Sequence, residues 1–245
     1  MGNLERILNL NSASIYGAGG YGIIIKPLKQ EKEVFKLFFD IDSCNKIRNE
    51  ALIQEKVYII LKKYISDIGI PEITYFNKNK QIEFLKKQYL CGIGMEYLPP
   101  PDGFNESVHI ILGYNGDDID TSWGQSQAYP VSETNPTRGF FASSEMMELI
   151  WDEEGSDMTI ERMAYLMGYS YSILIKHRIL PVDVEWIWSN GKPYIIDFGL
   201  CEQLDEPMNP REFLEITGTR GLHTDIYVPH KGDRGYDEFI SGLLN

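Results

Sequence analysis

The segment 183–199 constrains the fold more than any other part of the chain. Two runs rich in β-branched and aromatic residues flank the dipeptide Asn190-Gly191. Asn-Gly between two apolar runs is the strongest short-range signal for a β-hairpin. The sequence therefore predicts a hairpin over about 184–196 that delivers Asp197 from its second strand, with Phe and Gly directly after it.

Three acidic residues lie at the open end of this hairpin. Asp183 and Glu185 are two residues apart, so both side chains point to one face of the first strand. A three-residue turn would set Asp183 opposite Asp197, whereas a two-residue turn would set Val184 there, and both registers stay open. Because neighbouring carboxylates repel unless a cation joins them, we expect Mg²⁺ at Glu185 and Asp197. The alternative is an acidic loop around a structural turn.

A glycine-rich run near the N-terminus matches the pattern G-x-G-x-x-G. It contains Gly17, Gly19 and Gly22, and three isoleucines follow it. A dinucleotide-binding turn precedes a helix, so a strand at this place favours a hairpin loop over nucleotide phosphates. Glycine suits such a loop because it lets the backbone approach a phosphate closely. The alternative is a plain glycine turn.

The next apolar run, residues 34–39, contains Lys36. A lysine inside an apolar strand is costly unless it is paired. Residues 43–64 show helical spacing of apolar positions, and Glu50 on this helix is the expected partner, with Glu55 in reserve. A strand lysine paired with a helix carboxylate can contact nucleotide phosphates. In the alternative, Lys36 points to solvent and both glutamates lie on an exposed helix face.

A run of three prolines divides the chain into two parts. Residues 1–98 are strand-rich with one helix, and residues 99–245 are helical around the hairpin. A buried helix is expected over 158–177, and the polar stretch 113–138 is a candidate surface insertion. We therefore expect an α+β fold with a boundary near 98–101.

Composition limits the class of binding partner and the cellular compartment that we expect for this protein. The chain has 23 Lys and Arg against 36 Asp and Glu, a net charge of −13, which argues against nucleic acid or an anionic membrane as the main partner. No apolar run reaches the roughly 18 residues of a membrane-spanning helix, and the N-terminus lacks a secretory pattern. Since Cys44, Cys91 and Cys201 are scattered and odd in number, we expect no disulfide framework and a reducing, cytoplasmic compartment.

Taken together, these features resemble the protein-kinase fold. The features that follow one another in kinase order are the glycine run, Lys36, Glu50, the segment 95–98 as a hinge, and Asp197 with its Phe and Gly. The resemblance implies a two-lobed fold with a reduced C-terminal lobe and ATP between the lobes. It further implies adenine at the backbone near Glu96 and Tyr97, and metal binding by Asp197.

A closer resemblance is to an uncharacterised family of kinase-like domains, mostly fungal, often labelled zinc finger proteins. It covers about residues 90–245 and rests on short strings at 95–100, 183–187 and 227–229, together with Phe239. The zinc label finds no support in the sequence, because three cysteines and four histidines offer no ligand pairs at zinc spacing.

The catalytic loop departs from the kinase pattern. His177 and Arg178 are followed by Ile179, where kinases have an aspartate. Asp183 lies nearby at a different spacing and is the best candidate to orient an acceptor hydroxyl. We therefore weigh a divergent phosphotransferase, with Asp183 and Lys36 as catalytic residues and a protein substrate, against an inactive pseudokinase that binds a protein partner. In a third reading, the motifs are coincidental.

Overall fold

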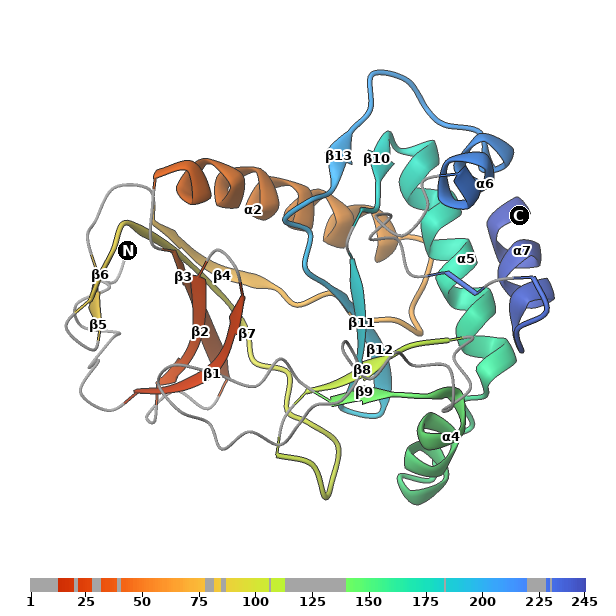
Figure 1. Ribbon diagram of the computed structural model, residues 1–245, viewed down its shortest axis with the longest axis horizontal. Coiled ribbons are helices and arrows are strands. Elements are labelled where there is room, and N and C mark those ends of the chain that lie inside the picture. The colour runs from red at the N-terminus through yellow and green to blue at the C-terminus, as the bar shows by residue number, and fades with distance from the viewer. Residues whose placement is uncertain are drawn as a thin grey trace.

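The computed structural model describes residues 13–19, 22–27, 32–38, 41–77, 82–84, 87–105, 107–112, 140–182, 184–219, 228–229 and 231–245. Within these ranges the chain has a mixed α+β fold (Figure 1). The candidate insertion at 113–138 and Asp183 lie outside the described residues. None of the helices in the described ranges is long and apolar enough to cross a membrane.

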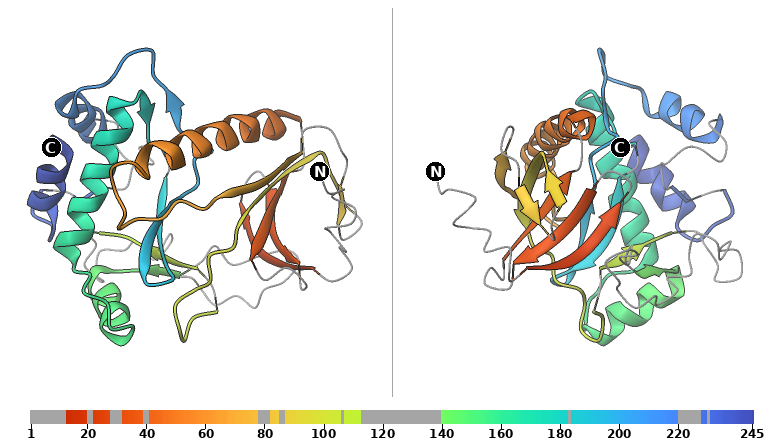
Figure 2. Two further views of the ribbon diagram at one scale, coloured as in Figure 1. Left: turned by 180° about the vertical axis from the view of Figure 1, so that it is seen from behind. Right: turned by 60° about the vertical axis from the view of Figure 1, so that its left-hand side comes forward.

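An antiparallel sheet of five strands, in the order β1-β2-β3-β7-β4, forms one end of the molecule (Figures 1 and 2). Its strands are β1 (Ala13–Gly19), β2 (Gly22–Pro27), β3 (Glu33–Phe38), β4 (Ile73–Asn77) and β7 (Cys91–Glu96). Their β-branched and aromatic residues fit a pleated, partly buried surface. The short strands β5 (Ile82–Phe84) and β6 (Lys87–Tyr89) pair with each other.

Helix α2 (Ile41–Leu61) runs from this sheet towards the helices at the opposite end of the molecule (Figure 1). Residues four apart lie on one helix face, and Ile53, Val57 and Leu61 are all buried. These three side chains belong to the largest core cluster, which extends through the chain to Leu243. The boundary expected near 98–101 therefore does not divide the core, and the division into domains stays a prediction.

A second sheet, in the order β12-β11-β8-β9, contains the expected hairpin. Its strands are β8 (Val108–Ile110), β9 (Phe140–Ala142), β11 (Glu185–Ser189) and β12 (Lys192–Ile196). The turn has two residues, Asn190 and Gly191, and both take positive φ as such tight hairpins require. Because Glu185 faces Ile196, Val184 is in line with Asp197, which decides the register that the sequence left open.

The described residues after β9 form four helices, which lie on the side of the second sheet that faces away from the five-stranded sheet (Figure 1). They are α4 (Ser144–Glu153), α5 (Ile160–Lys176), α6 (Pro210–Thr219) and α7 (Tyr236–Leu244). Helix α5 begins where Thr159 accepts a hydrogen bond from the Arg162 backbone and ends at His177, so the helix predicted over 158–177 is confirmed. The short strands β10 (Ile179–Leu180) and β13 (Glu202–Gln203) pair beyond its C-terminus.

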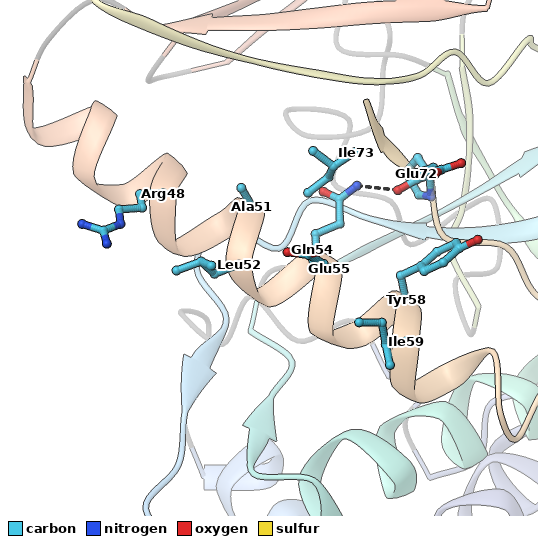
Figure 3. Close-up of a pocket in the computed structure, with 10 residues that line it drawn as sticks. Arg48, Ala51, Leu52, Gln54, Glu55, Tyr58, Ile59, Glu72 and Ile73 are labelled. Atoms are coloured by element: carbon cyan, nitrogen blue, oxygen red, sulfur yellow. Dashed lines mark hydrogen bonds between the residues drawn. The ribbon is translucent and has the colours of Figure 1, made fainter. Parts of the chain in front are cut away.

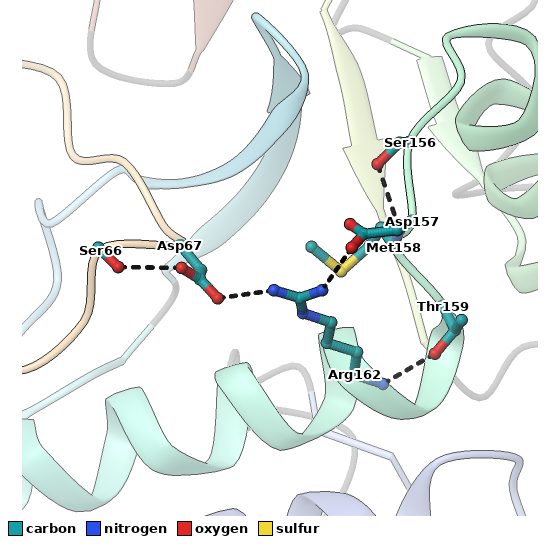
Figure 4. A network of polar contacts seen from close by, with 7 residues as sticks. All are labelled: Ser66, Asp67, Ser156, Asp157, Met158, Thr159 and Arg162. Carbon is teal, nitrogen blue, oxygen red and sulfur yellow. Dashed lines mark hydrogen bonds and ion pairs between the residues drawn. The ribbon is translucent and has the colours of Figure 1, made fainter.

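The loop after α2 is fixed to the second half of the fold. Gly69 exchanges backbone hydrogen bonds with Pro193 and Ile195 of β12. In the same loop, Asp67 accepts a hydrogen bond from Arg162 of α5 at 2.8 Å (Figure 4). Arg162, and then Ser66, hold the pKa of Asp67 below its ordinary value. These contacts fix the C-terminal end of α2 against the hairpin.

Cys44 of α2 and Cys91 of β7 form a disulfide, with Cα atoms 5.7 Å apart. The expectation of no disulfide is therefore wrong. The two cysteines are 47 residues apart in the sequence, and only the packing of α2 on the sheet brings them together. Disulfides persist in oxidising compartments, so this bond weighs against the reducing compartment that we expected. The cytoplasmic location stays a prediction.

Candidate functional site

Lys36 joins the two halves of the molecule. It lies in the middle of β3, and its Nζ donates to Glu50 Oε1 of α2 at 2.9 Å. The same Nζ donates to Asp197 Oδ1, directly after β12, at 3.1 Å. The predicted pairing of Lys36 with Glu50 is confirmed, and the reserve partner, Glu55, is exposed. Three segments far apart in the sequence thus converge on one ammonium group.

Two of the three side chains in this ion-pair network are largely buried. The side chain of Glu50 is 5% exposed and that of Lys36 is 18% exposed. Burial by itself lowers the pKa of Lys36, but the charges and hydrogen bonds of Glu50 and Asp197 outweigh it and raise this pKa above its ordinary value. Burial raises the pKa of Glu50, and Lys36 acts against that rise. Lys36 is therefore a fixed cation.

The residues around Asp197 hold its carboxylate at the site. Asp197 has a φ of 56°, a left-handed conformation that is rare outside glycine and concentrates at functional sites. Phe198 is fully buried in the main core. Gly199 packs closely, since a Cβ added there would lie 3.3 Å from Glu50 Oε2. In the Asp-Phe-Gly sequence, Asp197 therefore supplies the carboxylate and Phe198 fixes the backbone in the core. Gly199 has no side chain to crowd the nearby carboxylates of Glu50 and Asp197.

The glycine run lies at the β1–β2 hairpin, as its sequence context predicted. Gly19 faces Gly22, and the residues between them lie outside the described part of the chain. Gly17 pairs with Ile24, which pairs in turn with Lys36. One row across the sheet therefore connects the glycine run to the lysine, and no helix follows this run.

Two backbone donors of the expected hinge, those of Glu96 and Tyr97, are occupied. The N–H of Glu96 donates to Glu72 and the N–H of Tyr97 donates to Lys32, so neither N–H is available to a base. The ring of Tyr97 packs edge-on against Tyr16 of β1, with centroids 5.4 Å apart. Adenine at this segment would have to use other groups, such as the carbonyls or Leu98.

Strand β11 presents two different faces. Trp186 and Trp188 are buried in the main core. The alternate residues face the segment after β7, where Ile187 packs with Leu98 and Ser189 donates to the carbonyl of Pro99 at 2.7 Å. Because strand side chains alternate, Glu185 lies on the same face as Ile187 and Ser189. This face connects the expected hinge to the acidic end of the hairpin.

Glu185 and Asp197 fit Mg²⁺ by the chemistry of their oxygens. Glu185 lies directly opposite Ile196, the residue before Asp197. Their side chains are 28% and 41% exposed, so both reach solvent, and carboxylate oxygens are the donors that Mg²⁺ prefers. The described residues contain no group of three metal-binding side chains. The third acid of the predicted set, Asp183, lies outside them.

Sequence reasoning missed the partner of Glu185. The Nδ1 atom of His109, on β8, lies 3.0 Å from Glu185 Oε2. His109 is buried between Val108 and Ile110 in a three-residue strand that the sequence analysis did not predict. The sequence signal was a single histidine, His109, between two apolar β-branched residues, and this pattern does not predict which residue the histidine contacts.

Two other features lie apart from this site. His177 is exposed at the end of α5, and its Nε2 contacts the hydroxyl of Tyr64 at 3.3 Å. A pocket of about 420 Å³ lies along the outward face of α2 and beside β4 (Figure 3). The exposed Leu52 and Ile59 line it, and Gln54 donates to the Pro71 carbonyl at its wall. None of Lys36, Glu50, Glu185 or Asp197 lines this pocket.

Comparison with protein families and curated sequences found no match: no protein-family model matches the chain, and no curated protein sequence matches it.

Proposed function

We propose that this chain is a divergent protein-kinase-like phosphotransferase that uses ATP and Mg²⁺. The observation that carries the proposal is the contact of Lys36 with both Glu50 and Asp197. A coincidence of short motifs does not require these three residues to meet, so their convergence counts against the third reading of the sequence. The five-stranded sheet with α2 would form the first lobe, and the reduced second lobe would follow Leu98.

The nucleotide would lie along the face of β11 that carries Ile187. Its base would pack near Ile187 and Leu98, which are buried together. Glu185 is two residues before Ile187 on β11, which is about 7 Å at the usual rise per residue. Asp197 follows Ile196, the residue opposite Glu185. The phosphates would therefore extend towards Lys36 and the glycine hairpin.

Phosphoryl transfer depends on positioning and on charge neutralisation. The acceptor oxygen forms a bond to the γ-phosphorus, and the bond from that phosphorus to the β–γ bridging oxygen breaks. The proton of the acceptor hydroxyl passes to a base, for which Asp183 is the proposed carboxylate. Lys36 neutralises charge on the phosphate oxygens. Mg²⁺, held by Glu185 and Asp197, would supply further neutralisation when bound.

A nucleotide-binding pseudokinase is the second candidate, and the position of His177 favours it. In the kinase resemblance, His177 and Arg178 would belong to the catalytic loop. Here His177, at the end of α5, contacts Tyr64 and not the residues of the Lys36 network. The described residues of this loop therefore supply no base at the site.

Thermal unfolding with and without ATP, each with and without Mg²⁺, tests nucleotide binding. A ligand at 100 times its dissociation constant stabilises the fold by about 2.7 kcal/mol. We expect a Mg²⁺-dependent rise in the melting temperature of the wild type and loss of that rise in Asp197→Asn. The matched control is Asp152→Asn, which changes an exposed acid on α4 and should respond like the wild type.

Transfer of radiolabelled γ-phosphate to the chain itself or to a generic protein acceptor separates the two candidates. Binding with transfer that Asp183→Asn abolishes supports the phosphotransferase. Binding without transfer supports the pseudokinase. Absence of any shift at millimolar ATP and Mg²⁺ contradicts both.

A further inference from the structure

We infer that the Cys44–Cys91 disulfide is a redox switch on the candidate site. The intact bond holds the first half of α2 on the sheet, where Glu50 reaches Lys36, and reduction of the bond releases this half of the helix. The observation that carries the inference is the attachment of α2 to one sheet at two neighbouring points, one covalent and one ionic. The effect on nucleotide affinity rests on the proposed function.

The two attachment points lie close together on β3 and β7. In the register of these antiparallel strands, Lys36 pairs with Ile93. Phe38, two residues after Lys36, pairs with Cys91. Paired residues share a face of the sheet, and so do residues two apart on one strand. Lys36 and Cys91 therefore lie on the same face, separated by about 7 Å along the strands.

The disulfide lies in the part of α2 that precedes Glu50. Cys44 is six residues before Glu50, about 9 Å along the helix axis. Among the side chains that the structure describes in α2 before Glu50, that of Cys44 packs against the sheet, whereas Arg48 and Asn49 are exposed. Ala51, two turns after Cys44, joins the same small cluster but adds only a methyl group. The first half of α2 therefore depends on the disulfide for its position.

The second half of α2 is held independently of the disulfide. Ile53, Val57 and Leu61 are buried in the main core. Breaking the disulfide should therefore loosen the first turns of α2 and leave the rest of the fold in place. An unattached helix end frays, and Glu50 would then lie in the turn next to the frayed end. The 2.9 Å contact between Glu50 and Lys36 is the interaction that this loosening disrupts.

Exposure gives the thiol–disulfide exchange a direction. Cys44 is only partly buried, whereas Cys91 is 1% exposed. One thiolate of a dithiol attacks the Cys44 sulfur, the bond between Cys44 and Cys91 breaks, and Cys91 leaves as a thiolate that takes up a proton. The second thiolate of the dithiol then displaces Cys44, which is protonated in turn. The dithiol is thereby oxidised to a disulfide, and its two electrons reduce the protein.

Acylation of Lys36 at pH 9, read by peptide mapping, measures this ion pair without any nucleotide. The samples are oxidised wild type, wild type reduced with dithiothreitol, and Cys44→Ser. In the last two, Lys36 keeps Asp197 but loses the hold of Glu50, so its labelling should be several-fold faster than in oxidised wild type. Labelling of the exposed Lys63 should be equal in all three.

Two control variants separate the switch from other effects. Cys201→Ser removes the free cysteine and keeps the disulfide, so it should respond to dithiothreitol as the wild type does. Gly168→Ala crowds the contact between α5 and α7 and should destabilise the protein there. It should nevertheless label Lys36 as slowly as oxidised wild type, because a general loss of stability does not release α2.

The affinity for ATP with Mg²⁺ is then measured on the same samples. We expect it to fall several-fold in reduced wild type and in Cys44→Ser, and to recover on reoxidation in the wild type alone. Equal Lys36 labelling in oxidised and reduced wild type, or ATP affinity that is the same in both, overturns the inference and leaves the proposed function intact. Absence of ATP binding in every sample contradicts the proposed function, whereas faster labelling on reduction still supports the hold of the disulfide on Glu50.

Discussion

At the scale of single residues, Lys36 places a positive charge between the apolar residues Phe35 and Leu37 of β3. The Lys36 side chain is itself only 18% exposed, so its ammonium needs partners of opposite charge. Glu50 and Asp197 supply them. Lys36 thus stays charged and fixed in direction, which is what a phosphate-binding cation requires.

Slow chemical modification of Lys36 is the first prediction. Amine-directed reagents attack the neutral form, and the pKa of Lys36 is raised above its ordinary value of 10.5. Its ion pairs stabilise the fold fully below pH 10.5, and this contribution is lost only as the pH rises through the raised pKa. Peptide mapping after acylation at pH 9 should show much slower labelling of Lys36 than of the exposed Lys63.

A glutamine at position 50 provides the matched test. Glu50→Gln removes one of the two carboxylates, so labelling of Lys36 should speed up while labelling of Lys63 stays unchanged. Equal labelling rates for the two lysines in the wild type would show that Lys36 is not held as described.

Sequence order predicted the Lys36–Glu50 pair but not the His109–Glu185 pair. The first could be inferred because a costly strand lysine needs a carboxylate, and the next helix offers two candidates. The second depends on the pairing of β8 with β11. A strand of three residues is too short for its sequence pattern to predict which strand it pairs with. Spacing along the chain carries no information about that pairing.

At the scale of elements, α5 and α7 cross with their backbones in contact. A Cβ added at Gly168 of α5 would lie 2.1 Å from the Phe239 carbonyl oxygen of α7. A Cβ added at Gly242 of α7 would lie 2.3 Å from the Tyr165 carbonyl oxygen of α5. Both helices therefore use glycine where the other approaches most closely, although glycine is a poor helix former.

Replacing either glycine with alanine should destabilise the protein. Helix propensity alone favours alanine by about 1 kcal/mol. Forcing extra atoms into a packed interface costs about 1–3 kcal/mol or more, and here the obstacle is backbone, which cannot rotate away. Urea denaturation of Gly168→Ala and Gly242→Ala should therefore give lower midpoints than the wild type.

The control for this prediction is Ser241→Ala, at an exposed position of α7. It gains helix propensity without meeting α5, so its midpoint should equal or exceed that of the wild type. If Gly242→Ala behaves like Ser241→Ala, the close approach of the two helices is wrong.

At the scale of the whole molecule, one core joins the two parts that we expected the proline run to divide. Leu61 of α2 is fully buried in the same cluster as Trp151, Trp186 and Trp188. The loop after α2 adds backbone hydrogen bonds from Gly69 to β12. The two parts should therefore unfold together.

Leu61→Ala tests this coupling. The loss of a buried leucine should cost about 2–5 kcal/mol. All four tryptophans follow residue 98, so fluorescence reports on the second part alone. We expect Leu61→Ala to lower the midpoint by fluorescence and by circular dichroism equally. A fluorescence transition that stays at the wild-type midpoint would show that the parts unfold separately.

The sequence by itself determined the local elements and the kinds of chemistry at the candidate site. Strand runs, the Asn-Gly turn and the helix spacing depend on neighbouring residues, so the hairpin and α5 could be predicted close to their observed bounds. Only the tertiary structure decided the hairpin register, the Cys44–Cys91 disulfide and the partner of Glu185. These depend on which distant surfaces pack together, and packing is decided by the shape and burial of the whole chain.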